Sequence, residues 1–144
     1  MSARDLPDWS ILVEIQKIRP RKTSMFKSEV VELPSYEWVT VLVFEGEGVM
    51  KILNIYAKAE DVLIDVYADD NLVCEWAMYT VNYASDIGEV FKWKQIKRDT
   101  TNNEYMIEWH EEIPFQERVE VLLNNQTDAP VKAEVTALFE VNVD

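Results

Sequence analysis

Residues 62–81 read VLIDVYADDNLVCEWAMYTV, and this stretch decides the fold class. In Val62–Tyr67 every second residue is valine or isoleucine, which is the period of two that a half-buried strand shows. A second apolar run occupies Leu72–Val81, and Asp69-Asp70-Asn71 separates the two runs. Asp and Asn bond their own backbone and tolerate positive φ, so these three residues predict a tight turn. The stretch therefore predicts a β-hairpin.

The same alternation recurs along the rest of the chain, with a strand about every ten to twelve residues. Gly46-Glu47-Gly48 lies between two of these runs and predicts another hairpin. Ile87–Arg98 fits a strand or a single short helix, and its alternation favours a strand. The further strands that we predict are Ser10–Ile18, Glu37–Glu45, Val49–Tyr56, Val90–Ile96, Glu104–His110, Arg118–Leu123 and Val131–Val141.

So many short strands predict an all-β fold. We expect a two-sheet antiparallel sandwich, jelly-roll or Greek-key like, with about eight or nine strands, and an up-and-down barrel is the alternative. A chain of 144 residues that is 48% hydrophobic supplies one core, so residues 1–144 are expected to form a single β-sandwich domain. Residues 1–28 would form a basic N-terminal arm together with the first strand.

Charge is unevenly distributed along the chain. Residues 1–28 hold six Lys or Arg against three acids, a net charge of +3, although the whole chain has a net charge of −13. Residues 29–144 therefore have a net charge of −16. So acidic a body argues against nucleic-acid binding, which needs a basic surface. A basic segment before an acidic body can instead guide contacts between copies.

Several cofactor and location classes fit the sequence poorly. Three glycines do not make a glycine-rich phosphate loop, and the single Cys74 excludes an intrachain disulfide, so we expect no cofactor and a small core side chain at Cys74. No apolar run reaches the roughly 18 residues of a membrane helix, and the N-terminus lacks a signal-peptide pattern. We expect a protein made in a cytoplasm, with no membrane partner.

The acidic residues suggest two further hypotheses, a metal site and a pair of catalytic carboxylates. His110 could share a strand face with Glu108 and Glu112 as a metal site, but the same residues make an acidic edge, which we favour. A carboxylate pair for glycoside hydrolysis is also conceivable among 27 acids, yet no pair stands out. We therefore predict no catalytic or metal residue.

The aromatic residues divide into two groups. Trp38, Trp76 and Trp109 fall within strong strand patterns and are expected in the core. Trp9 and Trp93 stand beside charges and, where exposed, are candidate anchors for a partner, because Trp is enriched at interface hot spots.

The segment Lys17–Lys27 is basic, broken by Pro20 and without core-forming periodicity, so we predict a loop or arm there. Its basic residues are candidate interface residues, which would lie against the acidic surface of a neighbouring copy. The alternative is a charged loop on its own domain. The basic residues that we predict at the interface are Arg19, Arg21, Lys22 and Lys27. A second basic cluster, which could serve the same purpose, consists of Lys92, Lys94, Lys97 and Arg98.

The order of strands and turns resembles a known group of proteins. Gly48–Glu75 runs from a glycine turn through two amphipathic strands to the Asp69-Asp70-Asn71 turn, and Ile113-Pro114-Phe115 and Arg118–Asn125 follow later. This pattern looks like the β-sandwich modules of virus and bacteriophage particle proteins. Together the matching segments cover a little over a third of the chain.

The resemblance implies a non-enzymatic structural protein of a virion, such as a capsid-decorating, minor capsid or tail component. Such a protein would act as a homo-oligomer and contact other particle proteins. The alternative is a carbohydrate- or ligand-binding β-sandwich, which exposed Trp and Tyr on one sheet face would favour. A third reading, a small hydrolase, would need carboxylates clustered around a cleft.

Overall fold

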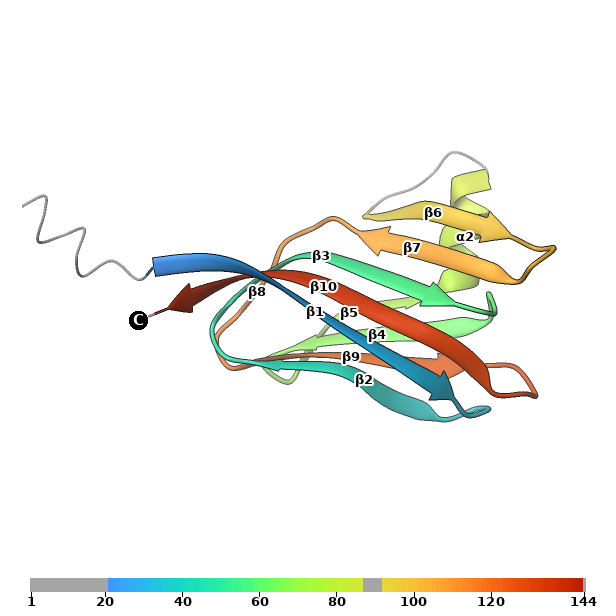
Figure 1. Cartoon of the computed structure of the whole chain (residues 1–144), viewed down its shortest axis with the longest axis horizontal. Coiled ribbons are helices and arrows are strands. Elements are labelled where there is room, and N and C mark those ends of the chain that lie inside the picture. The colour runs from blue at the N-terminus through green and yellow to red at the C-terminus, as the bar shows by residue number, and fades with distance from the viewer. Residues whose placement is uncertain (1–20, 87–91, 144) are drawn as a thin grey trace, which may run out of the picture.

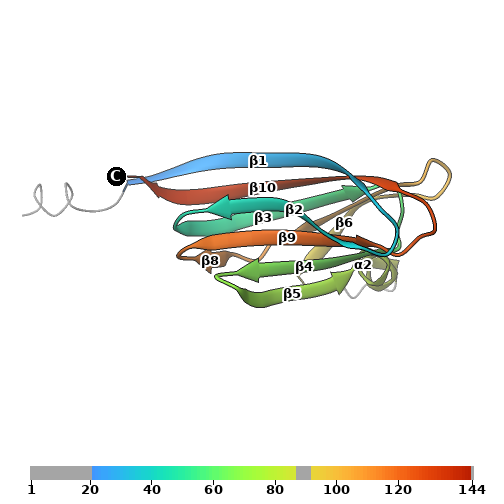
Figure 2. The same cartoon turned by 90° about the horizontal axis from the view of Figure 1, so that it is seen from below.

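Ten strands form two antiparallel sheets that pack face to face, in a computed structural model that describes residues 21–86 and 92–143 (Figures 1 and 2). In the six-stranded sheet the strand order is β1 (Arg21–Leu33), β10 (Val131–Val143), β3 (Gly48–Ala57), β7 (Glu104–Trp109), β6 (Trp93–Asp99). The short strand β8 (Ile113–Phe115) lies outside this order and pairs with β3. The four-stranded sheet has the order β2 (Trp38–Glu45), β9 (Arg118–Asn125), β4 (Val62–Ala68), β5 (Asn71–Ala77). The two-sheet antiparallel sandwich is confirmed.

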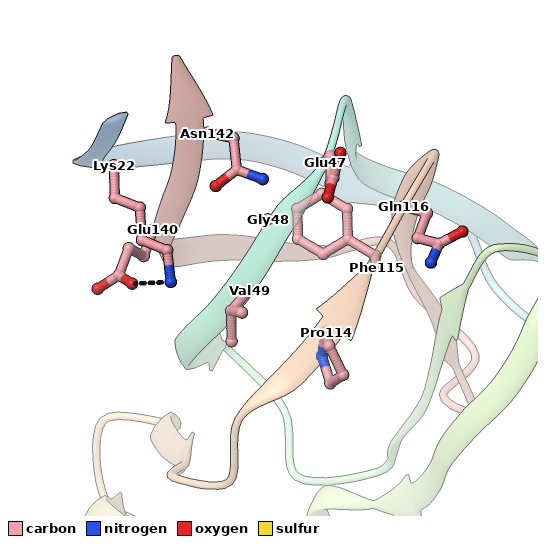
Figure 3. Close-up of a pocket in the computed structure, with 9 residues that line it drawn as sticks. All are labelled: Lys22, Glu47, Gly48, Val49, Pro114, Phe115, Gln116, Glu140 and Asn142. Carbon is pink, nitrogen blue, oxygen red and sulfur yellow. Dashed lines mark ion pairs between the residues drawn. The ribbon is translucent and has the colours of Figure 1, made fainter. Parts of the chain in front are cut away.

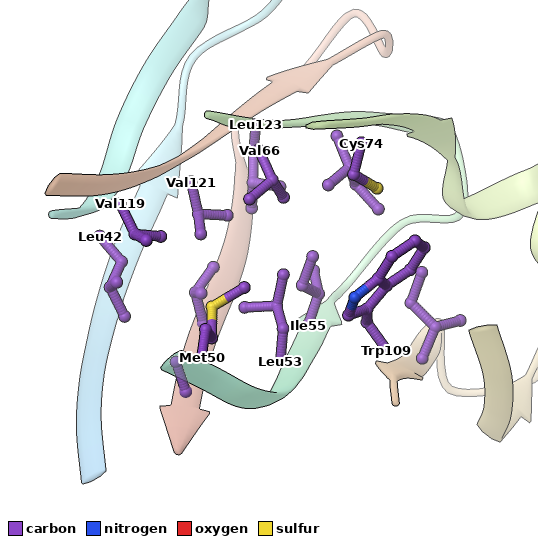
Figure 4. Packing of buried hydrophobic residues seen from close by; sticks show 14 of the residues in the cluster. Leu42, Met50, Leu53, Ile55, Val66, Cys74, Trp109, Val119, Val121 and Leu123 are labelled. Atoms are coloured by element: carbon purple, nitrogen blue, oxygen red, sulfur yellow. The ribbon is translucent and has the colours of Figure 1, made fainter. Parts of the chain in front are cut away.

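The core lies between the two sheets and is built from their alternating apolar residues. Figure 4 shows Leu42, Val66 and Val121 of the four-stranded sheet facing Met50 and Leu53 of the six-stranded sheet. Cys74 is buried here as predicted. Burial, together with the negative charge of Asp65, raises the pKa of the Cys74 thiol to about 12, so it stays protonated at neutral pH.

Aromatic rings close the core near the end of β10. Phe139 stacks on Phe44, with ring centroids 4.5 Å apart, and meets Phe115 edge to face at 5.8 Å. These three rings come from β10, β2 and β8, so they join the two sheets. Stacked and edge-to-face arrangements are the favoured geometries of aromatic pairs.

The hairpin predicted for residues 62–81 is confirmed for β4 and β5, which pair through a tight turn at Asp69 and Asp70. Its last four residues, however, begin the helix α2 (Met78–Asp86) instead of continuing the strand. Met78 and Val81 are buried whereas Tyr79 and Tyr83 are exposed, which is helical spacing. The prediction of strand for 78–81 is therefore wrong.

The hairpin predicted around Gly46-Glu47-Gly48 is also wrong. β2 and β3 lie in different sheets, so the chain crosses from one layer to the other between them. Leu42 and Met50 then face each other across the core, where both are fully buried. Gly48 is needed at the crossing because a Cβ there would collide with the carbonyl oxygen of Glu140.

Other element predictions differ in smaller ways. Strands were expected at Val90–Ile96 and Glu104–His110, and the structure has Trp93–Asp99 and Glu104–Trp109. The strand predicted at Ser10–Ile18 lies outside the described residues. The chain has ten described strands where eight or nine were expected, because β1 and β8 were not foreseen. No helix in the described ranges combines the length and hydrophobicity needed to cross a membrane.

Candidate assembly surface

The strand β1 is the most exposed element of the described chain. It pairs with β10 over its whole length, from Arg21 opposite Val143 to Leu33 opposite Val131, and no other described strand pairs with its free edge. Only its last residues reach the core, where Leu33 is fully buried. Residues 22–30 of β1 are exposed except for half-buried Lys27, and the strand begins beyond the end of the smaller sheet (Figure 2). The prediction of a loop or arm is therefore wrong for residues 21–27, which are strand.

Large apolar side chains project from this uncovered part. Phe26 is 72% exposed, Val30 59% and Met25 37%. Phe26 and Val30 point to the outer face of the six-stranded sheet, because they lie opposite Leu138 and Glu134 of β10. Met25 points to the other face. An edge strand with apolar residues on both faces presents a template for pairing with another chain.

The apolar surface continues from β1 across the outer face of the six-stranded sheet. Phe26 lies opposite Leu138, and Leu138 lies opposite Ile52, so the three side chains form a row over β1, β10 and β3. A shallow groove of about 330 Å³ follows this row. Its other lining residues are Asn54, Met106, Glu108 and Thr136.

Charged residues also lie along β1. Lys27 and Glu29 share the face that is turned toward the four-stranded sheet, and the Lys27 ammonium donates a hydrogen bond to the Val43 carbonyl of β2. Inward-pointing charges on an edge strand discourage indiscriminate pairing. Lys27, a predicted interface residue, is therefore held partly by its own chain.

The other predicted basic interface residues lie at or before the start of β1. Arg21 is the first residue of the strand, and the Lys22 ammonium pairs with the Glu140 carboxylate at 3.6 Å. Lys22 and Glu140 also border an open pocket of about 280 Å³ with Gly48, Pro114 and Phe115 (Figure 3). Arg19 and Trp9 lie outside the described residues.

Two tryptophans occupy the opposite environments from those expected. Trp93, a predicted surface anchor, is 2% exposed and meets Trp109 edge to face with ring centroids 5.2 Å apart. It is a core residue, because its strand position points inward beside Trp109. Trp38, expected in the core, is 45% exposed on the first residue of β2.

The second basic cluster is paired largely within the chain. The Lys92 ammonium lies 2.7 Å from the Glu111 carboxylate, and the Lys97 ammonium lies 3.1 Å from that of Glu104. Arg98 binds the Glu60 carboxylate with two nitrogens, at 2.8 and 3.2 Å. These ion pairs connect β6 and the residue before it to acidic residues of the same chain.

A second groove, of about 250 Å³, lies on the four-stranded sheet and is lined by Trp38, Leu63, Asp65, Glu75, Trp76 and Ala77. Asp65 and Glu75 face each other across β4 and β5. One carboxylate oxygen of Asp65 is buried without a hydrogen-bond partner. Burial, and secondarily the charge of Glu75, raises the pKa of Asp65. The groove is lined by two tryptophans and by a carboxylate that has one oxygen without a hydrogen-bond partner.

The acidic edge around His110 forms only a simple pair. The His110 imidazole Nε2 lies 3.3 Å from the Glu108 carboxylate. Within residues 21–86 and 92–143, no three His, Cys, Asp or Glu side chains are grouped so that they could hold a metal ion.

Comparison with known proteins finds structural likeness only. No family model matches the chain, and no curated protein sequence matches it. The chain is similar to a chain of the capsid asymmetric unit of cyanophage Pam1, at 9% identity and a TM-score of 0.46, over 86% of this chain and 87% of that one. It is also similar to the VP2 subviral particle of infectious bursal disease virus, at 12% identity and a TM-score of 0.43.

The second match covers 87% of this chain but only 34% of the viral chain, so this chain spans about a third of that protein. The Gx strain of the same virus gives a similar match, with 10% identity and a TM-score of 0.39, over 87% of this chain and 32% of that one. Because these TM-scores lie below 0.5, the likenesses assign no function to this chain. Its function has to be argued from its own surface.

Sequence reasoning missed Met25, Phe26 and Val30 as surface residues. They lie in the part of β1 that is largely exposed on both faces, so polar and apolar residues mix on each face and the alternation that marks a half-buried strand is absent. The one usable signal was the basic composition around them, which marked the segment as lying on the surface.

Proposed function

We propose that this chain is a non-enzymatic structural protein of a virion, and that it acts through protein contacts made by β1. The observation that supports the proposal is the uncovered part of β1, with Phe26, Val30 and Met25 exposed beside an unpaired backbone edge. Exposed edges and apolar patches are used for association between chains. The virion setting follows the resemblance of its strand and turn pattern to particle proteins, as a capsid-decorating, minor capsid or tail component.

Association through β1 can be tested by light scattering of the full chain over a range of concentrations. We expect an oligomer that the double substitution F26S/V30S weakens by about tenfold or more, because it removes the largest apolar side chains from the edge. The control is L72S/V73S, which also removes two exposed apolar side chains, from β5, an edge strand of the other sheet. The control should keep the molar mass of the unmodified chain.

A monomer at every concentration, or equal effects of the two double substitutions, would contradict association through β1. Circular dichroism of each variant checks that the sandwich is folded, because both pairs of residues are exposed and should leave the core intact.

A second candidate function is ligand binding in the groove that Trp38 and Trp76 line. Exposed indole surface beside carboxylate acceptors suits the stacking and hydrogen bonding that saccharides use. A glycan-binding screen should then find a ligand whose binding W38A abolishes. The substitution Y83A removes an exposed ring from α2 and should leave that binding unchanged.

A further inference from the structure

The uncovered edge of β1 has a pattern of side chains that fits a second copy of itself. Antiparallel strands from two identical chains meet around a two-fold axis, and the same surface is then used on both. When the axis is perpendicular to the sheet, one residue lies opposite itself and the others pair at equal distances on either side. The residue on the axis therefore fixes the whole register.

We infer that two copies of the chain join their six-stranded sheets by antiparallel pairing of β1 with β1, with Ser28 on the two-fold axis. This inference rests on the proposed function and names its first partner and geometry. β1 is an edge strand of the six-stranded sheet, no other described strand pairs with its free edge, and it is exposed from Lys22 to Val30 except at half-buried Lys27.

With Ser28 on the axis, apolar residues lie opposite apolar residues on the outer face, and serine lies opposite serine. Phe26 lies opposite Val30 of the second copy, and Ser28 lies opposite the second Ser28. Since the two-fold axis repeats each contact, two Phe26–Val30 pairs flank the axis. Aromatic residues opposite β-branched residues are stabilising cross-strand pairs. Phe26 also belongs to the row with Leu138 and Ile52, so the apolar surface becomes continuous across the junction.

The inner face is complementary in charge in the same register. Lys27 lies opposite Glu29 of the second copy, again twice, and Met25 lies opposite Val31. The Lys27 ammonium already donates to the Val43 carbonyl, but it has three protons and can also reach a carboxylate beside it. Opposite charges across strands stabilise pairing, whereas like charges destabilise it.

Neighbouring registers lose this match. With Lys27 on the axis the two Lys27 ammonium groups face each other, and with Glu29 on the axis the two Glu29 carboxylates do. With Phe26 on the axis, Val30 faces Lys22 and Met25 faces Lys27. Lys27 and Glu29 thus act as selectors, because they permit one register and oppose the adjacent ones.

The register predicts which engineered cysteine links two copies. In the full chain, S28C sets two thiols directly opposite each other, within reach of a disulfide or a short bismaleimide. S24C is the matched control, because Ser24 is also an exposed serine on the outer face of β1. In this register the two cysteines of S24C would lie eight residues apart along the paired strands, roughly 26 Å, which is too far for a disulfide or a short bismaleimide. Cys74 is buried and should not react.

We expect S28C to give a covalent dimer as the main product on a non-reducing gel, at least about tenfold more than S24C. Two results would contradict the register: S24C links as well as S28C, or S28C does not link although light scattering shows the chain to be oligomeric. In either case association through β1 is still tested separately, by the F26S/V30S comparison. If the unmodified chain is monomeric at every concentration, the dimer and the proposed function both fail.

Discussion

Asn125 joins the end of β1 to the loop between β9 and β10. It is fully buried at the end of β9, and its side-chain nitrogen donates to the carbonyls of Leu33, at 3.1 Å, and Ala129, at 2.7 Å. Its side-chain oxygen accepts from the Thr127 backbone nitrogen and hydroxyl, at 2.9 and 2.6 Å. One side chain thus joins the end of β1 to the loop between β9 and β10.

The substitution N125A should destabilise the fold by about 2–3 kcal/mol, because it leaves several buried polar groups without partners. Urea unfolding followed by tryptophan fluorescence measures the change. N142A is the control: Asn142 lies on the outer face of β10, so its loss should change the free energy of unfolding by less than about 0.5 kcal/mol. Equal effects of the two substitutions would contradict the role of Asn125.

Among the elements, the β4–β5 turn is held by a carboxylate. Asp69 and Asp70 take positive φ values of 51° and 66°, and the Asp69 carboxylate accepts backbone hydrogen bonds from Gln116, Glu117 and Arg118 at 2.8, 2.7 and 3.0 Å. These bonds favour the charged form and lower the pKa of Asp69. The turn is thereby tied to the loop between β8 and β9.

A lowered pKa in the folded state means that Asp69 stabilises the fold above its unfolded pKa, and that this stabilisation is lost as pH falls through the lower folded pKa. D69N should therefore lower the urea midpoint at neutral pH, and its difference from the unmodified chain should shrink below about pH 3. D70N is the control, because Asp70 makes only a surface pair with Arg118. A difference that stays constant with pH would contradict this linkage.

Elements formed by neighbours in sequence were predictable, and those formed by distant residues were not. The β4–β5 hairpin was foreseen because its turn and both strands lie within 62–77. β2 and β3 have equally regular patterns, but a short link fits a hairpin or a crossing between sheets, and only packing of the whole core decides between them. β1 was missed because its partner β10 is about a hundred residues away and because most of its residues before Val31 are exposed on both faces.

The candidate surface followed the same rule. The basic composition of 17–27 marked the segment as exposed and placed Lys22 and Lys27 there, but the exposed apolar residues became visible only once β1 was seen to be an edge strand of the six-stranded sheet. Trp93 was predicted at the surface but is buried, and Trp38 was predicted in the core but is exposed. Both predictions failed because the sheet face on which a residue lies depends on where its strand begins.

For the whole molecule, the uneven charge predicts how association responds to salt. Residues 29–144 carry a net charge of −16, so two copies repel each other unless the basic leading segment lies near the acidic body of its neighbour. The triple substitution R19Q/R21Q/K22Q should then weaken association at low ionic strength. Because ions screen exposed charges beyond about 10 Å at 0.1 M salt, the difference from the unmodified chain should become small at about 0.5 M.

The control for that experiment is K92Q/K94Q/K97Q, which changes the net charge by the same amount on β6 and its approach, where Lys92 and Lys97 already pair with acids of their own chain. If general repulsion alone governs association, both triple variants weaken it equally at low salt. If the leading segment contacts a neighbour, only R19Q/R21Q/K22Q does. F26S/V30S should weaken association at both salt concentrations, because apolar burial is not screened. Light scattering of the four chains at two ionic strengths therefore separates the electrostatic contribution of the leading segment from the apolar contribution of β1.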